Sequence, residues 1–265
     1  MINEIRIESV EELIRRINDF PNHFFYRGHA DANWALQSSL ERILGGAWST
    51  EQAQLFEEDS INRFQSKFHL YDKENIEPDT KLAWLSIMQH YGVPTRLLDF
   101  TESPYVALYF AIEAYKPQSG ADLAVFALDY SAIMDQSIAF IASKDVEFKE
   151  TRSSVYKKQD LIFETIVDRF AYEIAWITEP KKLNARLDRQ AGSFLLSGDR
   201  GLRIADVLAS KQYKDVPMSK FIVPACLYTG VFALLRKMNI TSKSLYGDLD
   251  GLARSIRMQM QAYSV

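Results

Sequence analysis

Apolar residues recur at helical spacing in several parts of the chain. The first such segment follows Ser9, where Val10, Leu13 and Ile17 share one helical face and Glu12 completes a capping-box pattern with Ser9. Later segments with helical spacing are residues 50–71, 80–90, 103–115 and 229–260. We expect helices in all of these segments.

Short runs of aromatic and β-branched residues separate these segments and predict strands. They lie at residues 23–28, 95–100, 123–128, 192–196 and 221–223, and a longer β-rich stretch covers 160–178. Helices therefore come first and last, with the strands mostly between them. This order predicts an α+β fold with a central, mostly antiparallel sheet, flanked by N-terminal and C-terminal helices.

Composition narrows the class of protein. The 265 residues are 47% hydrophobic and 25% charged, which suffices for a sizeable core. A net charge of −4 gives no general attraction to phosphate backbones, although a local basic cleft can still bind a nucleic acid. The N-terminal residues do not form a signal-peptide pattern, and no apolar run approaches the roughly 18 residues of a membrane helix. We expect a cytoplasmic protein with no membrane partner.

The cysteines and histidines argue against a metal centre. The one cysteine, Cys226, excludes an intrachain disulfide and a zinc site built on thiols. Its position in the apolar run 221–227 favours a buried thiol over a reactive one. The four histidines do not pair at metal-ligand spacing, and the Walker, GxGxxG, HExxH and GxSxG signatures are missing. We therefore predict no bound metal.

The first group of candidate site residues is Tyr26-Arg27-Gly28-His29, at the end of a predicted strand. An arginine there needs a partner, and its planar fork suits phosphate or carboxylate. Gly28 would let a ligand approach the backbone. The alternative is a structural Arg27 that holds loop carbonyls or an acid such as Asp99.

A second group lies in a loop framed by glycine and proline, a setting that often carries binding residues. It contains His90, Tyr91, Thr95, Arg96, Asp99 and Thr101. Arg96 and Asp99 are close enough in sequence to form a salt bridge with each other, which would make both structural. Tyr91 could stack on a planar ring or belong to the core.

A third group lies near the predicted strand at 192–196 and includes Arg186, Arg189, Gln190, Gly192 and Phe194. The amide of Gln190 can donate and accept hydrogen bonds but cannot act as a general base. It could orient a ligand, or it could be a buried amide that ties two strands together.

These groups carry a family resemblance. FFYRGHADANWALQSSLER together with MQHYGVPTRLLDFTESPYVALYFA resembles the FRG domain, with Phe100 where tryptophan is more usual. ARLDRQAGSFLL and ITSKSLYGDLDGLARSI resemble later blocks of the family. The resemblance extends over about 20–257 and implies a single FRG-type domain in 1–265. The family is remotely similar to ADP-ribosyltransferases, which implies NAD as a substrate and an ADP-ribosyltransferase-like fold.

The resemblance also implies roles for individual residues. The catalytic candidates are Arg27, Asp99 and Gln190, and the NAD-binding candidates are Tyr26, Arg27, Gly28, His29, His90, Tyr91, Thr95, Arg96 and Thr101. Arg27 would bind pyrophosphate or ribose, and Tyr91 would stack on nicotinamide. The glutamate of ADP-ribosyltransferases is missing, since Gln190, Gly192 and Ser193 occupy the matching place. Asp99 or Glu164 would then supply the carboxylate.

Three functions are compatible with these residues. The first is an NAD-using ADP-ribosyltransferase-like enzyme that acts as a toxin or antiphage effector on a nucleic-acid or protein target. The second is a non-catalytic module that binds a nucleotide, a nucleic acid or a phage component. The third is a nuclease or other hydrolase that uses Asp99 and His90. The sequence makes no prediction of the oligomeric state.

Overall fold

One mixed sheet organises the protein. The computed structural model describes residues 2–71, 77–180 and 185–263. Within these residues, seven strands join in the order β1-β7-β4-β2-β3-β6-β5. The strands are β1 (Asn3–Arg6), β2 (Phe24–His29), β3 (Leu98–Thr101), β4 (Leu123–Asp129), β5 (Ala175–Thr178), β6 (Gly192–Ser197) and β7 (Met218–Val223). Every neighbouring pair is antiparallel except β1 and β7, so the predicted α+β fold with a mostly antiparallel sheet is confirmed.

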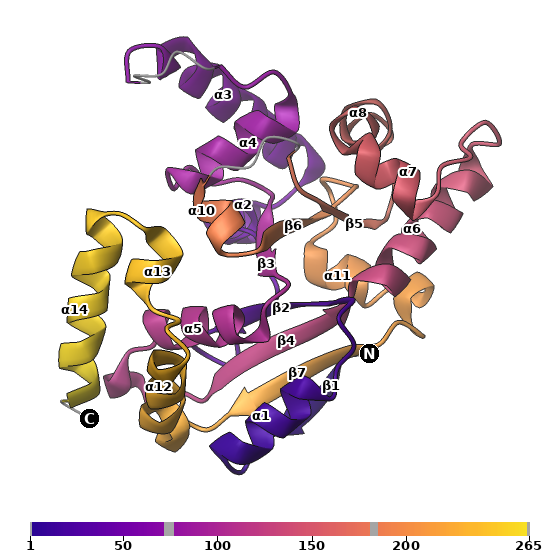
Figure 1. Cartoon of the computed structure of the whole chain (residues 1–265). Coiled ribbons are helices and arrows are strands. Elements are labelled where there is room, and N and C mark those ends of the chain that lie inside the picture. Colours follow the sequence, from indigo (N-terminus) through magenta and orange to yellow (C-terminus); the bar gives the residue numbers. More distant parts are fainter. Residues whose placement is uncertain (1, 72–76, 181–184, 264–265) are drawn as a thin grey trace.

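Helices cover both faces of this sheet (Figure 1). They are α1 (Val10–Asn18), α2 (Ser39–Leu44), α3 (Thr50–Phe68), α4 (Lys81–His90), α5 (Pro104–Ala114), α6 (Tyr130–Lys144), α7 (Arg152–Lys157), α8 (Gln159–Ile162), α9 (Asp168–Phe170), α10 (Ala185–Arg189), α11 (Ile204–Leu208), α12 (Tyr228–Lys237), α13 (Ser242–Tyr246) and α14 (Leu249–Tyr263). One hydrophobic cluster joins α1, α5 and α12 to the sheet, and a second joins α4, α6 and α11 to it. In the part of the chain that the structure describes, no helix is both long and apolar enough to cross a membrane.

Side-chain caps begin several of the predicted helices. The Ser9 hydroxyl accepts a hydrogen bond from the backbone N–H of Glu12 at the start of α1, and Thr80 and Ser103 cap α4 and α5 in the same way. The carboxylate of Glu12 accepts from the backbone N–H of Glu8 at 2.9 Å rather than from that of Ser9. The predicted start of α1 is therefore confirmed, with a modified capping box.

Successive side chains of β2 point to opposite faces of the sheet and so belong to different hydrophobic clusters. Tyr26 belongs to the hydrophobic cluster under α5, and Phe25 belongs to the cluster on the opposite face. Gly28 lies directly beneath α5, because a Cβ built on it would come within 1.8 Å of the Ala107 carbonyl oxygen and 2.8 Å of the Ala111 nitrogen. Gly28 therefore allows close packing of α5 on β2. The sequence did not predict this packing role.

We expect Gly28→Ala to destabilise the fold by about 3 kcal/mol, because the new methyl group meets the backbone of a helix that cannot move without repacking the core. Urea unfolding measures this loss. Gly46→Ala is the matched control, since a Cβ at Gly46 meets nothing within 4 Å. Equal midpoints for the two variants would contradict the packing role of Gly28.

Two expectations from the sequence need correction, and some elements were not predicted. The stretch 160–178 is β only at Ala175–Thr178, and before that it forms α8, a π-helical turn (Phe163–Val167) and α9. Ile162, Phe163 and Val167 are buried there, so helical packing overrides their β-propensity. Cys226 is exposed, because it lies in a short turn after β7. Strand β1 and helix α6 were not predicted.

Candidate functional site

The sheet opens between β2 and β3. These strands share a single residue pair, Tyr26 with Thr101, whereas β2 pairs with β4 along its whole length. Beyond Tyr26, the chain of β2 therefore separates from β3. The two halves of the sheet, β1-β7-β4-β2 and β3-β6-β5, form the sides of the gap.

A cleft of about 870 Å³ occupies this gap. Its volume lies in the range of clefts that bind small molecules and cofactors. Among its lining residues are Tyr26, Arg27, Gly28, His29, Trp34, Arg42, Gln89, His90, Asp99, Thr101, Glu113, Arg186, Gln190 and Tyr246. Eight of the eleven predicted site residues are in this set, and Tyr91, Thr95 and Arg96 are not. Three segments far apart in the sequence thus converge on one cleft.

Arg27 lies at the back of the cleft and bridges the opened strands. Its Nη1 donates to the carbonyl oxygen of Asp99 at 2.6 Å and lies 3.9 Å from the Asp99 carboxylate. Its Nε donates to Nε2 of His29 at 3.0 Å. Burial lowers the pKa of Arg27 to about 10, although Asp99 opposes this shift, so the guanidinium remains charged at neutral pH. Among the described residues, Nη2 has no hydrogen-bond partner.

His29 is a neutral partner for that guanidinium. Burial, followed by the charge of Arg27, lowers the pKa of His29 to about 3. The imidazole therefore accepts the Arg27 hydrogen bond on Nε2 and does not carry a charge at neutral pH. It fixes the direction of Arg27 and cannot act as a general acid there.

Asp99 is the accessible acid of the cleft. Its side chain is 55% exposed, and its Oδ2 accepts a hydrogen bond from Nε2 of Gln89 at 2.9 Å. Oε1 of Gln89 in turn accepts from the Thr95 hydroxyl at 2.6 Å. Thr95 therefore acts through Gln89 and lies outside the cleft. Gln89 was not among the residues predicted from the sequence. Its polar side chain in the last turn of α4, beside this loop, could have indicated it.

The third group closes the cleft from the side of β6. The Thr101 hydroxyl donates to the Gln190 carbonyl oxygen at 2.6 Å and ties the end of β3 to the turn after α10. The Gln190 amide nitrogen is buried and has no partner among the described residues. A buried amide without a partner is unfavourable, so a ligand acceptor at this wall would be stabilising.

Two further charged residues line the cleft: Glu113, which was not predicted, and Arg186, which belongs to the third sequence group. Glu113 accepts a hydrogen bond from the Tyr246 hydroxyl at 2.8 Å. The guanidinium of Arg186 lies 4.4 Å from the centre of the Tyr246 ring, in cation–π contact. Burial lowers the pKa of nearby His90, and Arg186 acts in the same direction. Arg27 and Arg186 thus place two cations in the cleft, and Trp34 adds a ring that is 53% exposed.

Comparison with protein families identifies the segment that carries most of these residues. A model of the FRG domain matches residues 22–120. The chain contains an FRG domain. In the same comparisons, no curated protein and no solved structure matched. The predicted family is therefore confirmed.

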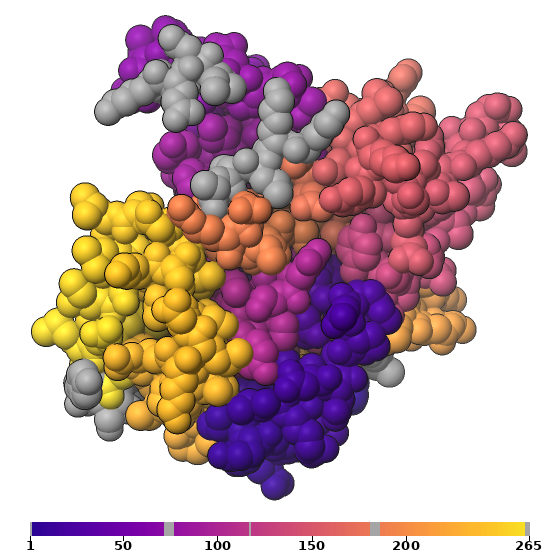
Figure 2. All heavy atoms as spheres, in the orientation of Figure 1, coloured from indigo at the N-terminus to yellow at the C-terminus, as the bar shows by residue number. Residues whose placement is uncertain are grey.

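The FRG segment does not build the cleft alone. It contributes Arg27, Gln89 and Asp99, whereas Arg186 and Gln190 follow it in sequence. The helix that carries Arg186, α10, lies beside α13 on the surface (Figure 2). The C-terminal part of the chain therefore contributes to the walls of the cleft.

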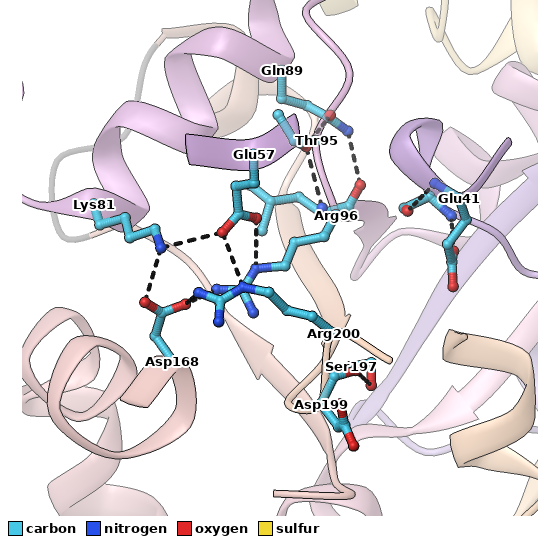
Figure 3. Close-up of polar contacts among 12 residues, drawn as sticks. Glu41, Glu57, Lys81, Gln89, Thr95, Arg96, Asp168, Ser197, Asp199 and Arg200 are labelled. Atoms are coloured by element: carbon cyan, nitrogen blue, oxygen red, sulfur yellow. Dashed lines mark hydrogen bonds and ion pairs between the residues drawn. The ribbon is translucent and has the colours of Figure 1, made fainter. Parts of the chain in front are cut away.

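Arg96, in the same FRG segment, points away from the cleft into a buried ion-pair cluster (Figure 3). Its side chain is 5% exposed and contacts the carboxylates of Glu57, at 2.9 Å, and Asp168. Lys81 and Arg200 contact the same two carboxylates. The expectation that Arg96 binds ligand is corrected, and its alternative pairing with Asp99 is also wrong.

Two further candidates lie elsewhere. Tyr91 is 67% exposed and makes an edge contact with His90, outside the cleft lining. Glu164 accepts a hydrogen bond from the backbone N–H of Lys81 at 2.6 Å, at the first turn of α4. Of the two candidate carboxylates, Asp99 and Glu164, the cleft therefore contains Asp99. Among the described residues, no cluster of three or more acidic, histidine or cysteine side chains could hold a metal.

Proposed function

We propose that the cleft binds NAD and that the protein transfers the ADP-ribosyl group of NAD to an acceptor. The observation that carries this proposal is the pairing of a fixed, charged Arg27 with an accessible Asp99 in one cleft of about 870 Å³. The guanidinium suits a pyrophosphate, because its remaining Nη2 hydrogens can bind phosphate oxygens. Arg186 adds a second cation to the lining of the cleft.

Asp99 would act on the ribose next to nicotinamide. In the reaction, the bond between ribose C1′ and the nicotinamide nitrogen breaks and nicotinamide leaves. An acceptor nucleophile forms the new bond to C1′ and loses its proton to solvent. The ribose is cationic in the transition state, and a carboxylate held by Gln89 would stabilise that charge. The buried amide of Gln190 would donate to a ribose hydroxyl.

Trp34 would supply a surface on which a planar ring of the dinucleotide stacks, because its ring is exposed and lines the cleft. This replaces the role first expected of Tyr91. An enzyme of this kind would consume cellular NAD or modify a nucleic-acid or protein target, in keeping with a toxin or antiphage effector.

Asp99→Asn is expected to lower the rate of nicotinamide release from NAD by about a hundredfold, because it removes the charge that faces the ribosyl cation. Nicotinamide is quantified by chromatography after incubation with purified protein. Because Asp99 is half exposed, the melting temperature should stay close to that of the wild type. Asp215→Asn is the matched control, since Asp215 is 85% exposed and lies outside the cleft. Full activity of Asp99→Asn would count against the assigned role.

A second candidate, a module that binds a nucleotide without turnover, is favoured by the residues of β6. Gly192 and Ser193 offer no carboxylate at the wall where Gln190 lies. The two candidates differ in outcome: NAD raises the melting temperature in both, but only the transferase releases nicotinamide.

A further inference from the structure

A second cavity lies near the start of β2 and the end of β5. Its volume is about 210 Å³, and it shares no lining residue with the cleft. It is bounded by the start of β2, the residue after β3, the end of β5, helix α7 and the first residue of α8. Its polar side chains include Glu102, Tyr130, Tyr156, Thr178 and Glu179. Nothing in the proposed function uses this cavity.

Within the part of the chain that the structure describes, the two carboxylates of this cavity have no cationic partner. Neither Glu102 nor Glu179 forms an ion pair or a hydrogen bond through its side chain with any described residue. Burial raises the pKa of Glu179, and the charge of Glu102 raises it further, so the two acids lie near enough to repel each other. A cation between them would relieve both effects.

A buried hydroxyl of the cavity wall also has no partner. Thr178 is 4% exposed, and its Oγ1 forms no hydrogen bond with the described residues. Because an isolated buried hydroxyl is unfavourable, such a group points to an acceptor or donor that occupies the cavity. It lies next to Glu179 in sequence, at the end of β5.

The other charged groups that the structure describes around the cavity are already paired. His23 lies 3.3 Å from the Asp129 carboxylate. Arg152, which affects the pKa of Tyr130, is held by Asp135 at 2.7 Å and by the Ser131 hydroxyl at 2.6 Å. None of them neutralises the two glutamates by direct contact. Among the described residues, no group of three or more acidic, histidine or cysteine side chains at this cavity could hold a metal.

We propose that this cavity binds a small organic cation that carries an ammonium or guanidinium group. Such a group would lie between Glu102 and Glu179 and donate to both carboxylates, while the Thr178 hydroxyl would bind a remaining polar atom. The rings of Tyr130 and Tyr156 line the same space and suit a cation or its alkyl chain. The group could belong to a free diamine or to an arginine or lysine side chain of a protein.

Calorimetric titration of the full chain with agmatine tests the proposal, because agmatine carries both an ammonium and a guanidinium group. We expect a dissociation constant below about 1 mM and no measurable binding of butylurea, its neutral counterpart. Glu102→Gln and Glu179→Gln should each weaken agmatine binding about tenfold or more, since each removes a charged hydrogen-bond acceptor. Glu147→Gln, an exposed glutamate outside the cavity, should leave binding unchanged.

A short capped peptide with one arginine separates the two sources of the cation. Tighter binding of the peptide than of agmatine assigns the cavity to a protein side chain, and the reverse order assigns it to a free amine. Equal affinity for agmatine and butylurea, or unchanged agmatine affinity in both glutamine variants, would overturn the proposal. Because the cavity and the cleft share no residue, either result is independent of whether NAD binds.

Discussion

Replacing Arg27 with alanine is expected to weaken NAD binding by about a hundredfold and to remove nicotinamide release. The guanidinium is held by His29 and by the Asp99 carbonyl, so its free hydrogens are already oriented toward the cleft before a ligand arrives. Truncation of a buried charged partner costs about 2–5 kcal/mol in binding. Calorimetry with NAD measures the loss directly.

Two further variants separate charge from geometry. Arg27→Lys keeps the charge but loses the planar fork and the contact with His29, so we expect intermediate affinity. Arg257→Ala removes an exposed arginine of α14 and should bind NAD as the wild type does. NAD affinity that is the same in Arg27→Ala and Arg257→Ala would show that Arg27 only holds the strands together, which was the alternative left open by the sequence.

The second large effect concerns the ion-pair cluster of Glu57, Lys81, Arg96, Asp168 and Arg200. Glu57→Gln is expected to destabilise the fold by about 3–5 kcal/mol, because three cations are left with one carboxylate in a buried site. Urea unfolding gives the free energy of unfolding. Asp59→Asn is the control, since Asp59 belongs to an exposed pair with Arg63 and should change stability by less than about 1 kcal/mol.

The balance of charge predicts a difference within the cluster. Arg96→Met leaves two cations with two carboxylates, so it should cost less than Glu57→Gln. A larger loss of stability for Arg96→Met than for Glu57→Gln would contradict this account.

The same cluster makes stability depend on pH. Burial raises the pKa of Asp168, but Arg96, Lys81 and Arg200 outweigh burial, so the pKa of Asp168 lies below its usual value. The stabilisation from Asp168 is therefore complete at neutral pH and is lost as the pH falls below about 4.

Much of the fold could be predicted because local signals agree with the final packing. Ser9, Thr80 and Ser103 cap the helices that their positions predicted, and the apolar run at 123–128 lies within the fully buried strand β4. The strand prediction for 160–173 was wrong because the spacing of its apolar residues fits a helix as well as a strand. Contact with the rest of the core decides between the two. Strand β1 has little hydrophobic character, since it pairs at an edge of the sheet.

Part of the site could also be predicted, because some of its residues carry local sequence signals. Arg27 and Asp99 could be identified because each stands beside a strand end in a polar, glycine-containing context. Arg96 could not be assigned from sequence, since its partners Glu57, in α3, and Asp168, in α9, are far from it along the chain. Glu113 and Tyr246 were missed because nothing in the sequence points to their place at the cleft. Tyr246 lies in a block that resembles the family, but only the packing of α13 brings it to the cleft.

The most direct test of the central claim is a crystal structure of the protein with carba-NAD, in which a methylene group replaces the ring oxygen of the nicotinamide ribose. We predict density in the cleft between β2 and β3, with the pyrophosphate against Arg27 and the ribose next to nicotinamide facing Asp99. An empty cleft at saturating ligand, or carba-NAD bound elsewhere on the chain, would contradict the account.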